Sequence, residues 1–122
     1  MTNLKEQIKH IVKSYKNSIS GLKTVYKEEI AFRQEIVLFI IGIILLIILP
    51  LSFIIKLFLF FSLMLILISE LINTAIEKTI DRISLEKHEI SKKAKDIGSA
   101  IVFLSLISAL FLWSFVIIKY LI

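Results

Sequence analysis

The stretch Glu70-Leu-Ile-Asn73-Thr-Ala-Ile-Glu77-Lys-Thr-Ile-Asp81 decides how this chain is built. It follows directly on the apolar run 57–69, so one helix passes from lipid-like to charged sequence. At about 100° per residue, its three acids and Asn73 fall within about 80° of one another, and we call this set the carboxylate stripe. Carboxylates at the depth of a membrane span are costly, which predicts a functional site. The alternative is a span that ends at Ser69, with the stripe as a solvated helix face.

The composition indicates an integral membrane protein. The chain has 122 residues, of which 57% are hydrophobic, and a mean hydropathy of +0.90. A soluble domain of this size could not hide so much apolar surface. The absence of cysteine excludes disulfides and thiol chemistry, and two histidines are too few for a histidine-rich metal site. A chain of this length is expected to form one domain.

The first unit, residues 4–27, has the pattern of a helix that lies on a membrane surface. Apolar residues keep helical spacing on one face from Leu4 to Tyr26, and six lysines flank them. A basic amphipathic helix of this kind lies in the membrane interface with its apolar face down, and each lysine near anionic headgroups contributes about 1 kcal/mol. A helix that packs on a soluble partner is the alternative. Nothing besides charge supports nucleic-acid binding.

Three transmembrane helices are expected next, at residues 29–49, 53–83 and 91–120. The nearly uncharged segment 36–55 is long enough, as a helix, to cross the roughly 30 Å hydrocarbon core of a bilayer. Pro50 predicts a tight turn near its end. The second helix is too long for the hydrocarbon alone, so its last turns must project from it. A short polar loop, 84–91, follows, and Ser91 is the predicted N-cap of the third helix.

The distribution of lysine and arginine predicts the orientation of the chain. The N-terminal helix and the loop after the second span hold nearly all of them, while the turn at 49–56 has one lysine and the C-terminus has Lys119. The positive-inside rule therefore places the N-terminus and the polar loop in the cytoplasm and the C-terminus outside.

Polar groups from all three spans are expected to converge at the cytoplasmic boundary: Glu29, Glu70, Asn73, Glu77, Lys95, Asp96 and Ser99. Paired carboxylates suit a hard cation such as Mg²⁺, which takes one or two carboxylates plus phosphate oxygens. A lysine can hold phosphate as a point charge, and a carboxylate deeper in apolar surroundings suits a general base. These groups predict phosphoryl transfer from a water-side nucleotide to a lipid-side acceptor, although the sequence has no Walker A loop. Glu29 and Arg33 are spaced as an i, i+4 ion pair.

Three motifs give the chain a resemblance to a known family: Glu29-Ile-Ala-Phe-Arg-Gln-Glu35, Glu70-Leu-Ile-Asn-Thr-Ala-Ile-Glu77 with Asp81-Arg82, and Ala94-Lys-Asp-Ile-Gly-Ser-Ala100. In this order, and with the three-span layout, the chain resembles the prokaryotic integral-membrane diacylglycerol kinase family over essentially its whole length. The resemblance implies a homotrimer of small three-span subunits in the bacterial inner membrane. It also implies that MgATP is used to phosphorylate the hydroxyl of diacylglycerol, giving phosphatidic acid.

The resemblance also assigns roles to positions of this sequence. It implies that Glu70 is the catalytic base and that Glu29 and Glu77 are the metal ligands. The positions that match nucleotide contacts are Glu29, Glu77, Glu86, His88, Lys95 and Asp96. The positions that match the lipid site are Glu35, Glu70, Ser99 and Trp113, and supporting positions are Asn73, Asp81, Arg33 and Gln34. The chain departs from the family pattern at His10, Asn17 and Lys92.

Two other functions are kept open. An undecaprenol kinase uses the same fold and acidic motifs on a longer acceptor, although the form of the first motif, 29–35, and the long N-terminal helix favour diacylglycerol. A non-catalytic small membrane subunit would use the stripe only to hold helices together, and would tolerate Glu→Gln changes there. The prediction is an all-α, ATP-dependent lipid kinase that acts on diacylglycerol with Mg²⁺ and has no nucleic-acid partner.

Overall fold

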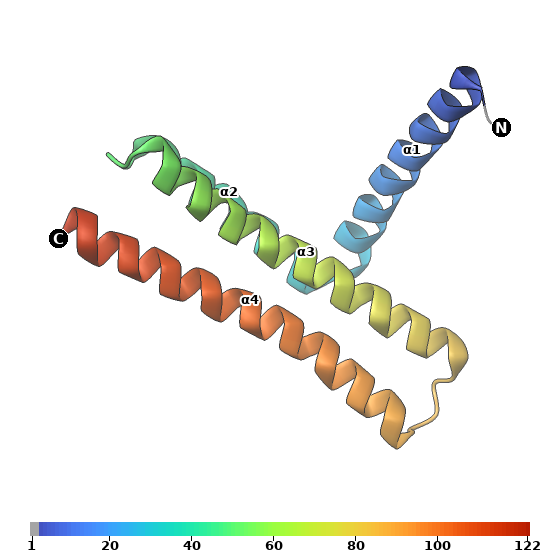
Figure 1. The fold of residues 1–122 in the computed structure, drawn as a ribbon. Coiled ribbons are helices and arrows are strands. Elements are labelled where there is room, and N and C mark those ends of the chain that lie inside the picture. Colours follow the sequence, from blue (N-terminus) through green and yellow to red (C-terminus); the bar gives the residue numbers. More distant parts are fainter. Residues whose placement is uncertain (1–2) are drawn as a thin grey trace.

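Four helices make up the part of the chain that the computed structural model describes, residues 3–122 (Figure 1). They are α1 (Leu4–Glu28), α2 (Ile30–Ile48), α3 (Phe53–Ile83) and α4 (Glu89–Leu121). No strand occurs within residues 3–122. Helices α2, α3 and α4 are each long and apolar enough to cross a membrane. The prediction of an all-helical chain with three candidate spans is confirmed.

Helices α1, α3 and α4 begin where a side chain accepts from a free backbone N–H group. Asn3 and Glu6 form a capping box at α1, in which Glu6 N–H donates to Asn3 Oδ1 at 2.8 Å. Ser52 Oγ accepts from Ile55 N–H at 3.4 Å, so α3 starts immediately after the proline turn. The 31 residues of α3 extend about 46 Å. That length exceeds a hydrocarbon core of about 30 Å, so one end of α3 must lie in polar surroundings.

Helix α4 begins earlier than the sequence predicts, because its N-cap is His88. The Nδ1 atom of His88 accepts a hydrogen bond from Ile90 N–H at 3.1 Å, and the first helical residue is Glu89. The prediction that Ser91 caps this helix is therefore wrong. Serine is the commoner capping residue, but any acceptor placed ahead of the first free N–H groups can take its role.

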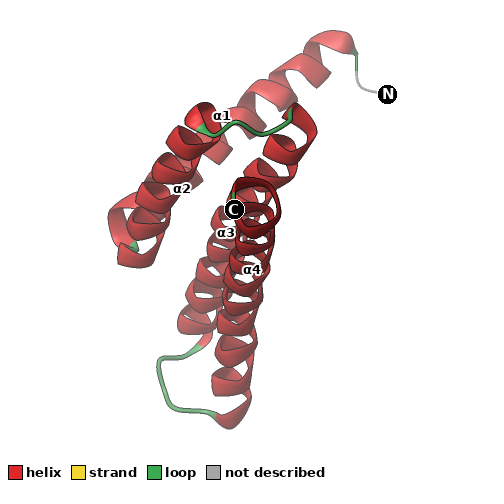
Figure 2. Cartoon of the chain, turned by 90° about the vertical axis from the view of Figure 1, so that its left-hand side faces the viewer, coloured by secondary structure: helices red, strands yellow, loops and turns green. Residues whose placement is uncertain are grey.

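Helices α3 and α4 run antiparallel, side by side along their length, and α2 packs on α3 (Figures 1 and 2). Helix α1 leaves the bundle at a steep angle and contacts mainly the start of α2 (Figure 1). Near the turn between α2 and α3, the core is the apolar cluster of Leu46, Leu59 and Val116. Large apolar side chains such as Ile47 and Phe111 are about three-quarters exposed, as expected of a surface that faces lipid.

The other half of the α3–α4 pair has a polar interior. Ser69, Glu70, Asn73 and Thr74 are all buried on α3. Gly98 of α4 lies against them, because a Cβ atom at that position would come within 2.6 Å of Asn73 Oδ1. Helices α3 and α4 therefore approach each other closely at Gly98. The absence of a side chain there leaves room for the Asn73 amide between the two helices.

Candidate active site

One cavity brings together polar residues from the start of α2 and from α3 and α4. It has a volume of about 440 Å³, and its polar lining residues are Glu29, Glu70, Asn73, Glu77 and Ser99. Of the seven residues that the sequence predicts to converge, these five lie around one space, which we call the acidic cavity. They include the expected catalytic base and both expected metal ligands. The other two, Lys95 and Asp96, line a different cavity, so the prediction is only partly right.

Glu70 lies deepest among the acids of the stripe and is only 5% exposed. The Glu35 side chain of α2 lies near enough for the two carboxyl groups to interact electrostatically. The Oε2 atom of Glu35 is buried and has no hydrogen-bond partner. Because buried acceptors are normally satisfied, this atom is open to a donor such as a substrate hydroxyl group.

Asn73 connects the deep part of the acidic cavity to its mouth. Its Nδ2 atom donates to Glu77 Oε1 at 3.4 Å, one helical turn further along α3. Its Oδ1 atom is buried against Gly98 and accepts no hydrogen bond. Glu77 is half-buried, so the stripe passes from a dry end at Glu70 to a wetter end at Glu77.

The oxygen atoms of the acidic cavity fit a divalent cation that is held together with a nucleotide. Glu29 and Glu77 supply two carboxylates, and the unpartnered Asn73 Oδ1 is a third oxygen nearby. Within residues 3–122, no three His, Cys, Asp or Glu side chains lie close enough to hold a metal ion by themselves. Mg²⁺ sites of nucleotide enzymes have this character, with one or two carboxylates and the remaining ligands from phosphates and water.

A second cavity, of about 680 Å³, lies around the loop between α3 and α4. Its lining includes four residues that the sequence predicts as nucleotide contacts: Glu86, His88, Lys95 and Asp96. Lys95 Nζ donates to Asp81 Oδ1 at 2.7 Å and so joins α4 to the last acid of the stripe. The six predicted nucleotide contacts are therefore divided, because Glu29 and Glu77 line the acidic cavity instead.

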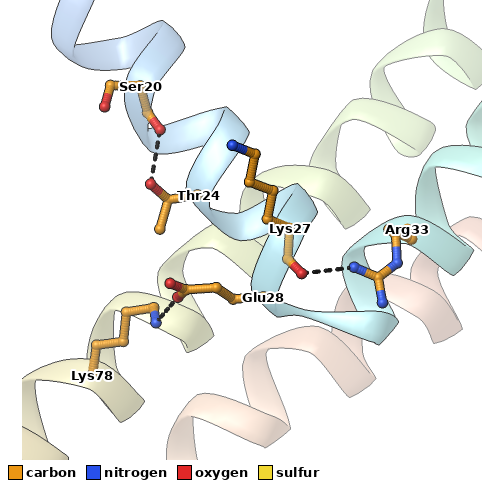
Figure 3. A network of polar contacts seen from close by, with 6 residues as sticks. All are labelled: Ser20, Thr24, Lys27, Glu28, Arg33 and Lys78. Atoms are coloured by element: carbon orange, nitrogen blue, oxygen red, sulfur yellow. Dashed lines mark hydrogen bonds and ion pairs between the residues drawn. The ribbon is translucent and has the colours of Figure 1, made fainter.

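Arg33 does not pair with Glu29, so that prediction is wrong. Its Nη1 atom donates to the backbone oxygens of Tyr26 and Lys27, at 2.7 and 2.9 Å. The last carbonyl groups of a helix lack partners within the helix, and a cation satisfies both them and the negative end of the helix dipole. Figure 3 shows the bond from Arg33 to the Lys27 carbonyl at the end of α1, beside an ion pair between Glu28 and Lys78.

The sequence offers little signal for the Glu28–Lys78 pair, because its members are 50 residues apart. Gln34 is exposed, and it lines neither the acidic cavity nor the cavity around the loop between α3 and α4.

Trp113 lies in the membrane-spanning part of the bundle, away from the acids. Its Nε1 atom donates to Ser62 Oγ of α3 at 3.0 Å, a contact that the sequence does not reveal. Trp113 also lines an apolar cavity of about 390 Å³ between α2, α3 and α4. Leu106 lines both this cavity and the acidic cavity, so an apolar space adjoins the carboxylates along α4.

Comparison with known proteins identifies the family. The family model described as prokaryotic diacylglycerol kinase matches residues 16–117. The chain is 38% identical over 113 residues to a diacylglycerol kinase of Escherichia coli strain K12, covering 93% of each chain. It is 39% identical over 110 residues to a diacylglycerol kinase of Haemophilus influenzae, covering 85% of this chain and 88% of the relative. It is 36% identical over 113 residues to one from Pseudomonas aeruginosa, covering 88% of this chain and 87% of the relative.

The matched region, residues 16–117, contains almost all of the three candidate membrane spans. Three candidate spans and bacterial relatives along most of the chain make this a multi-pass bacterial membrane protein. It belongs to the prokaryotic diacylglycerol kinase family.

Proposed function

We propose that this protein is a diacylglycerol kinase that transfers the γ-phosphoryl group of ATP directly to the lipid hydroxyl, giving phosphatidic acid. The observation that carries the proposal is the acidic cavity, in which a buried carboxyl group on a membrane helix and wetter acids line the same space. Such a cavity can meet a lipid acceptor at one end and a nucleotide at the other. Family membership supports the choice of reaction and of acceptor.

Glu70 is the proposed general base. It lies about 10 Å along α3 from Glu77, which separates the acceptor end of the cavity from the phosphate end. As the hydroxyl oxygen of diacylglycerol bonds to the γ-phosphorus, Glu70 accepts the hydroxyl proton. The bond from the γ-phosphorus to the bridging oxygen breaks in line, and ADP leaves. No phosphorylated protein intermediate is needed.

Glu29 and Glu77 are the proposed ligands of Mg²⁺, which would be shared with the ATP phosphates. When bound, the ion would neutralise charge on the transferred phosphoryl group. Lys95, oriented by Asp81, would hold a phosphate as a point charge. The proposed nucleotide contacts from the loop cavity are Glu86, His88 and Asp96.

The lipid would enter from the apolar side of the acidic cavity. Glu35, with its unpartnered Oε2 atom, and Ser99 flank the place proposed for the glycerol hydroxyl. The adjoining apolar cavity, with Trp113 in its wall, suits an acyl chain because its lining residues are almost all aliphatic or aromatic.

The assay that decides the function offers purified protein labelled ATP together with either diacylglycerol or undecaprenol. Labelled phosphatidic acid is the expected product. Transfer to undecaprenol alone would favour the alternative kinase, and transfer to neither would indicate a non-catalytic subunit. Direct transfer would be contradicted if the label were trapped on the protein as an intermediate that forms and decays at least as fast as turnover.

A homotrimer is proposed because one chain leaves the acidic cavity partly open, with Ser99 exposed, and polar groups exposed to lipid are costly. Each site would be completed by a neighbouring subunit. Because Glu29 and Glu70 line one cavity of the same chain, mixing Glu29→Gln and Glu70→Gln subunits should restore little activity. Clear recovery would show instead that the two residues of one site come from different chains, and a fully active monomer in detergent would contradict the trimer.

We place α1 on the cytoplasmic membrane surface and the C-terminus outside the cell. The exposed apolar side chains of α1, among them Leu4, Ile11 and Tyr15, support this location because a bilayer interface would cover them. The lysine distribution supports the orientation in the inner membrane. A reporter enzyme fused after Ile122 should be active only outside the cytoplasm. Cytoplasmic activity of that fusion would contradict both the topology and the placement of the site.

A further inference from the structure

The C-terminal end of α1 is held by side chains from two other helices (Figure 3). Lys78 of α3 forms an ion pair with Glu28, the last residue of α1. Arg33 of α2 donates to the backbone carbonyl groups of Tyr26 and Lys27. Most of α1 projects away from the bundle (Figure 1), so these contacts, together with the burial of Val25, hold its last turns in place.

Each member of the ion pair is next in sequence to an acid of the acidic cavity. Glu28 precedes Glu29, and Lys78 follows Glu77. Neither Glu28 nor Lys78 lines the cavity itself. The ion pair therefore joins the two chain segments that carry the proposed metal ligands, from outside the space that the ligand would occupy.

We propose that the Glu28–Lys78 ion pair positions Glu29 relative to Glu77 and thereby sets the affinity of the site for a divalent cation–nucleotide complex. The inference rests on the proposed function. Glu28 and Lys78 are positioning residues that do not touch the substrate, and Arg33 assists by holding the other side of the same helix end.

Glu29 needs such support because it lies between two helices. Its backbone is extended, with φ −114° and ψ 113°, and its side chain makes no capping hydrogen bond to α2. The direction of its carboxylate therefore depends on how α1 and α2 meet. Glu77, in contrast, lies inside the long helix α3 and is held by that helix and by Asn73. An ion pair from α3 to the residue before Glu29 adds the restraint that the helix junction lacks.

A simple charge effect is the competing explanation, because Lys78 also interacts electrostatically with Glu29 and Asp81. The two explanations differ in sign. If only charge matters, removing Glu28 and removing Lys78 must change the affinity for any charged ligand in opposite directions. If the pair positions the acids, either removal weakens binding, and removal of both weakens it no further.

The test measures binding without turnover in the full chain in detergent, using Mn²⁺ with an ATP analogue whose β- and γ-phosphates are joined by a methylene group. Electron paramagnetic resonance of free Mn²⁺ gives the dissociation constant. Glu28→Gln and Lys78→Met should each raise it about two- to five-fold, the range expected for an exposed pair. The double variant Glu28→Gln/Lys78→Met should match the single variants. The exchanged pair Glu28→Lys/Lys78→Glu should bind within about two-fold of the unaltered protein.

The two side chains are 48% and 51% exposed, so salt should screen the pair and reduce its effect. A matched control is Lys93→Met, which removes an exposed ion pair to Glu89 within α4 and should leave binding unchanged. Circular dichroism melting curves identify any variant that fails to fold, and Lys78→Gln then replaces Lys78→Met.

The inference would be overturned if the dissociation constants of Glu28→Gln and Lys78→Met shifted in opposite directions or did not shift. It would also be overturned if the control Lys93→Met shifted the dissociation constant as much as they do. Failure of the exchanged pair to restore binding in a folded protein would also overturn it. If the unaltered protein does not phosphorylate diacylglycerol, the proposed function fails, but the binding measurement still decides the role of the pair.

Discussion

The two ends of the α3–α4 pair differ in what fills the space between the helices. Near the turn at 49–52, Leu46, Leu59 and Val116 pack together, and a hydrogen bond joins Trp113 of α4 to Ser62 of α3. Near the loop at 84–88, buried polar groups replace that packing, and both Asn73 and Glu35 keep acceptors without a donor. Buried polar groups without partners are costly, so the second end gives up stability that the first end supplies. The comparison supports the proposal that the polar end carries the chemistry, while the apolar end stabilises the fold.

The largest effect should come from the deepest acid of the polar end. Glu70→Gln keeps the shape of the side chain but removes the proposed base, so phosphoryl transfer to diacylglycerol should fall about 10²–10⁴-fold. Nucleotide binding and subunit assembly should persist. Glu6→Gln, at the far end of α1, is the matched control and should keep full activity. Near-normal turnover of Glu70→Gln would contradict the role of Glu70.

Glu77→Gln tests the wetter end of the stripe. The change leaves an amide where a hard cation prefers a carboxylate, so the Mg²⁺ concentration for half-maximal activity should rise about 10-fold or more. Helical content and melting temperature should stay unchanged, because Glu77 is only half-buried. A Mg²⁺ titration that superimposes on that of the unaltered protein would refute the assignment.

Alanine substitutions at three glycines test whether the two ends differ in how tightly the helices pack. A Cβ at Gly98 would lie 2.6 Å from Asn73 Oδ1, so Gly98→Ala should destabilise the fold by about 1–3 kcal/mol and reduce activity by displacing the amide. At Gly42, in the apolar part, the Cβ would meet the flexible end of Leu63, which can move aside at lower cost. Gly21 has open space around it, so Gly21→Ala is the control and should be neutral or slightly stabilising.

Unfolding in detergent measures these three changes. Equal losses at Gly98 and Gly42 would contradict the distinction between the two ends.

The smallest effect concerns the polar link at the apolar end. Trp113→Phe removes the hydrogen bond to Ser62 but keeps an aromatic ring, and such bonds between membrane helices contribute about 0.6 kcal/mol. Unfolding of Trp113→Phe, Ser62→Ala and the double variant forms a thermodynamic cycle. We expect the stability lost by the double variant to be smaller, by about 0.6 kcal/mol, than the sum of the losses of the two single variants. Additive losses would show that the two residues act separately.

The predictability of the fold follows from where the controlling interactions lie in the sequence. The spans could be predicted because uncharged runs near the bilayer length are a local signal, and the stripe because helical periodicity places Glu70 and Glu77 on one face. The Arg33 contact could not be predicted, because backbone carbonyls at a helix junction compete with the nearby Glu29. The Glu28–Lys78 and Ser62–Trp113 pairs each join distant segments, and no local pattern encodes which side chains meet.

The His88 cap has a consequence for what the loop cavity can recognise. Since Nδ1 accepts from Ile90 N–H, the neutral ring must carry its hydrogen on Nε2, and a single tautomer is selected. His88 therefore offers a ligand one N–H donor and no free acceptor. Oxygen atoms of phosphate or ribose can receive that bond, whereas an amino group in the same place would find no partner. The start of α4 thus favours ligands that present a hydrogen-bond acceptor to His88 over ligands that present a donor there.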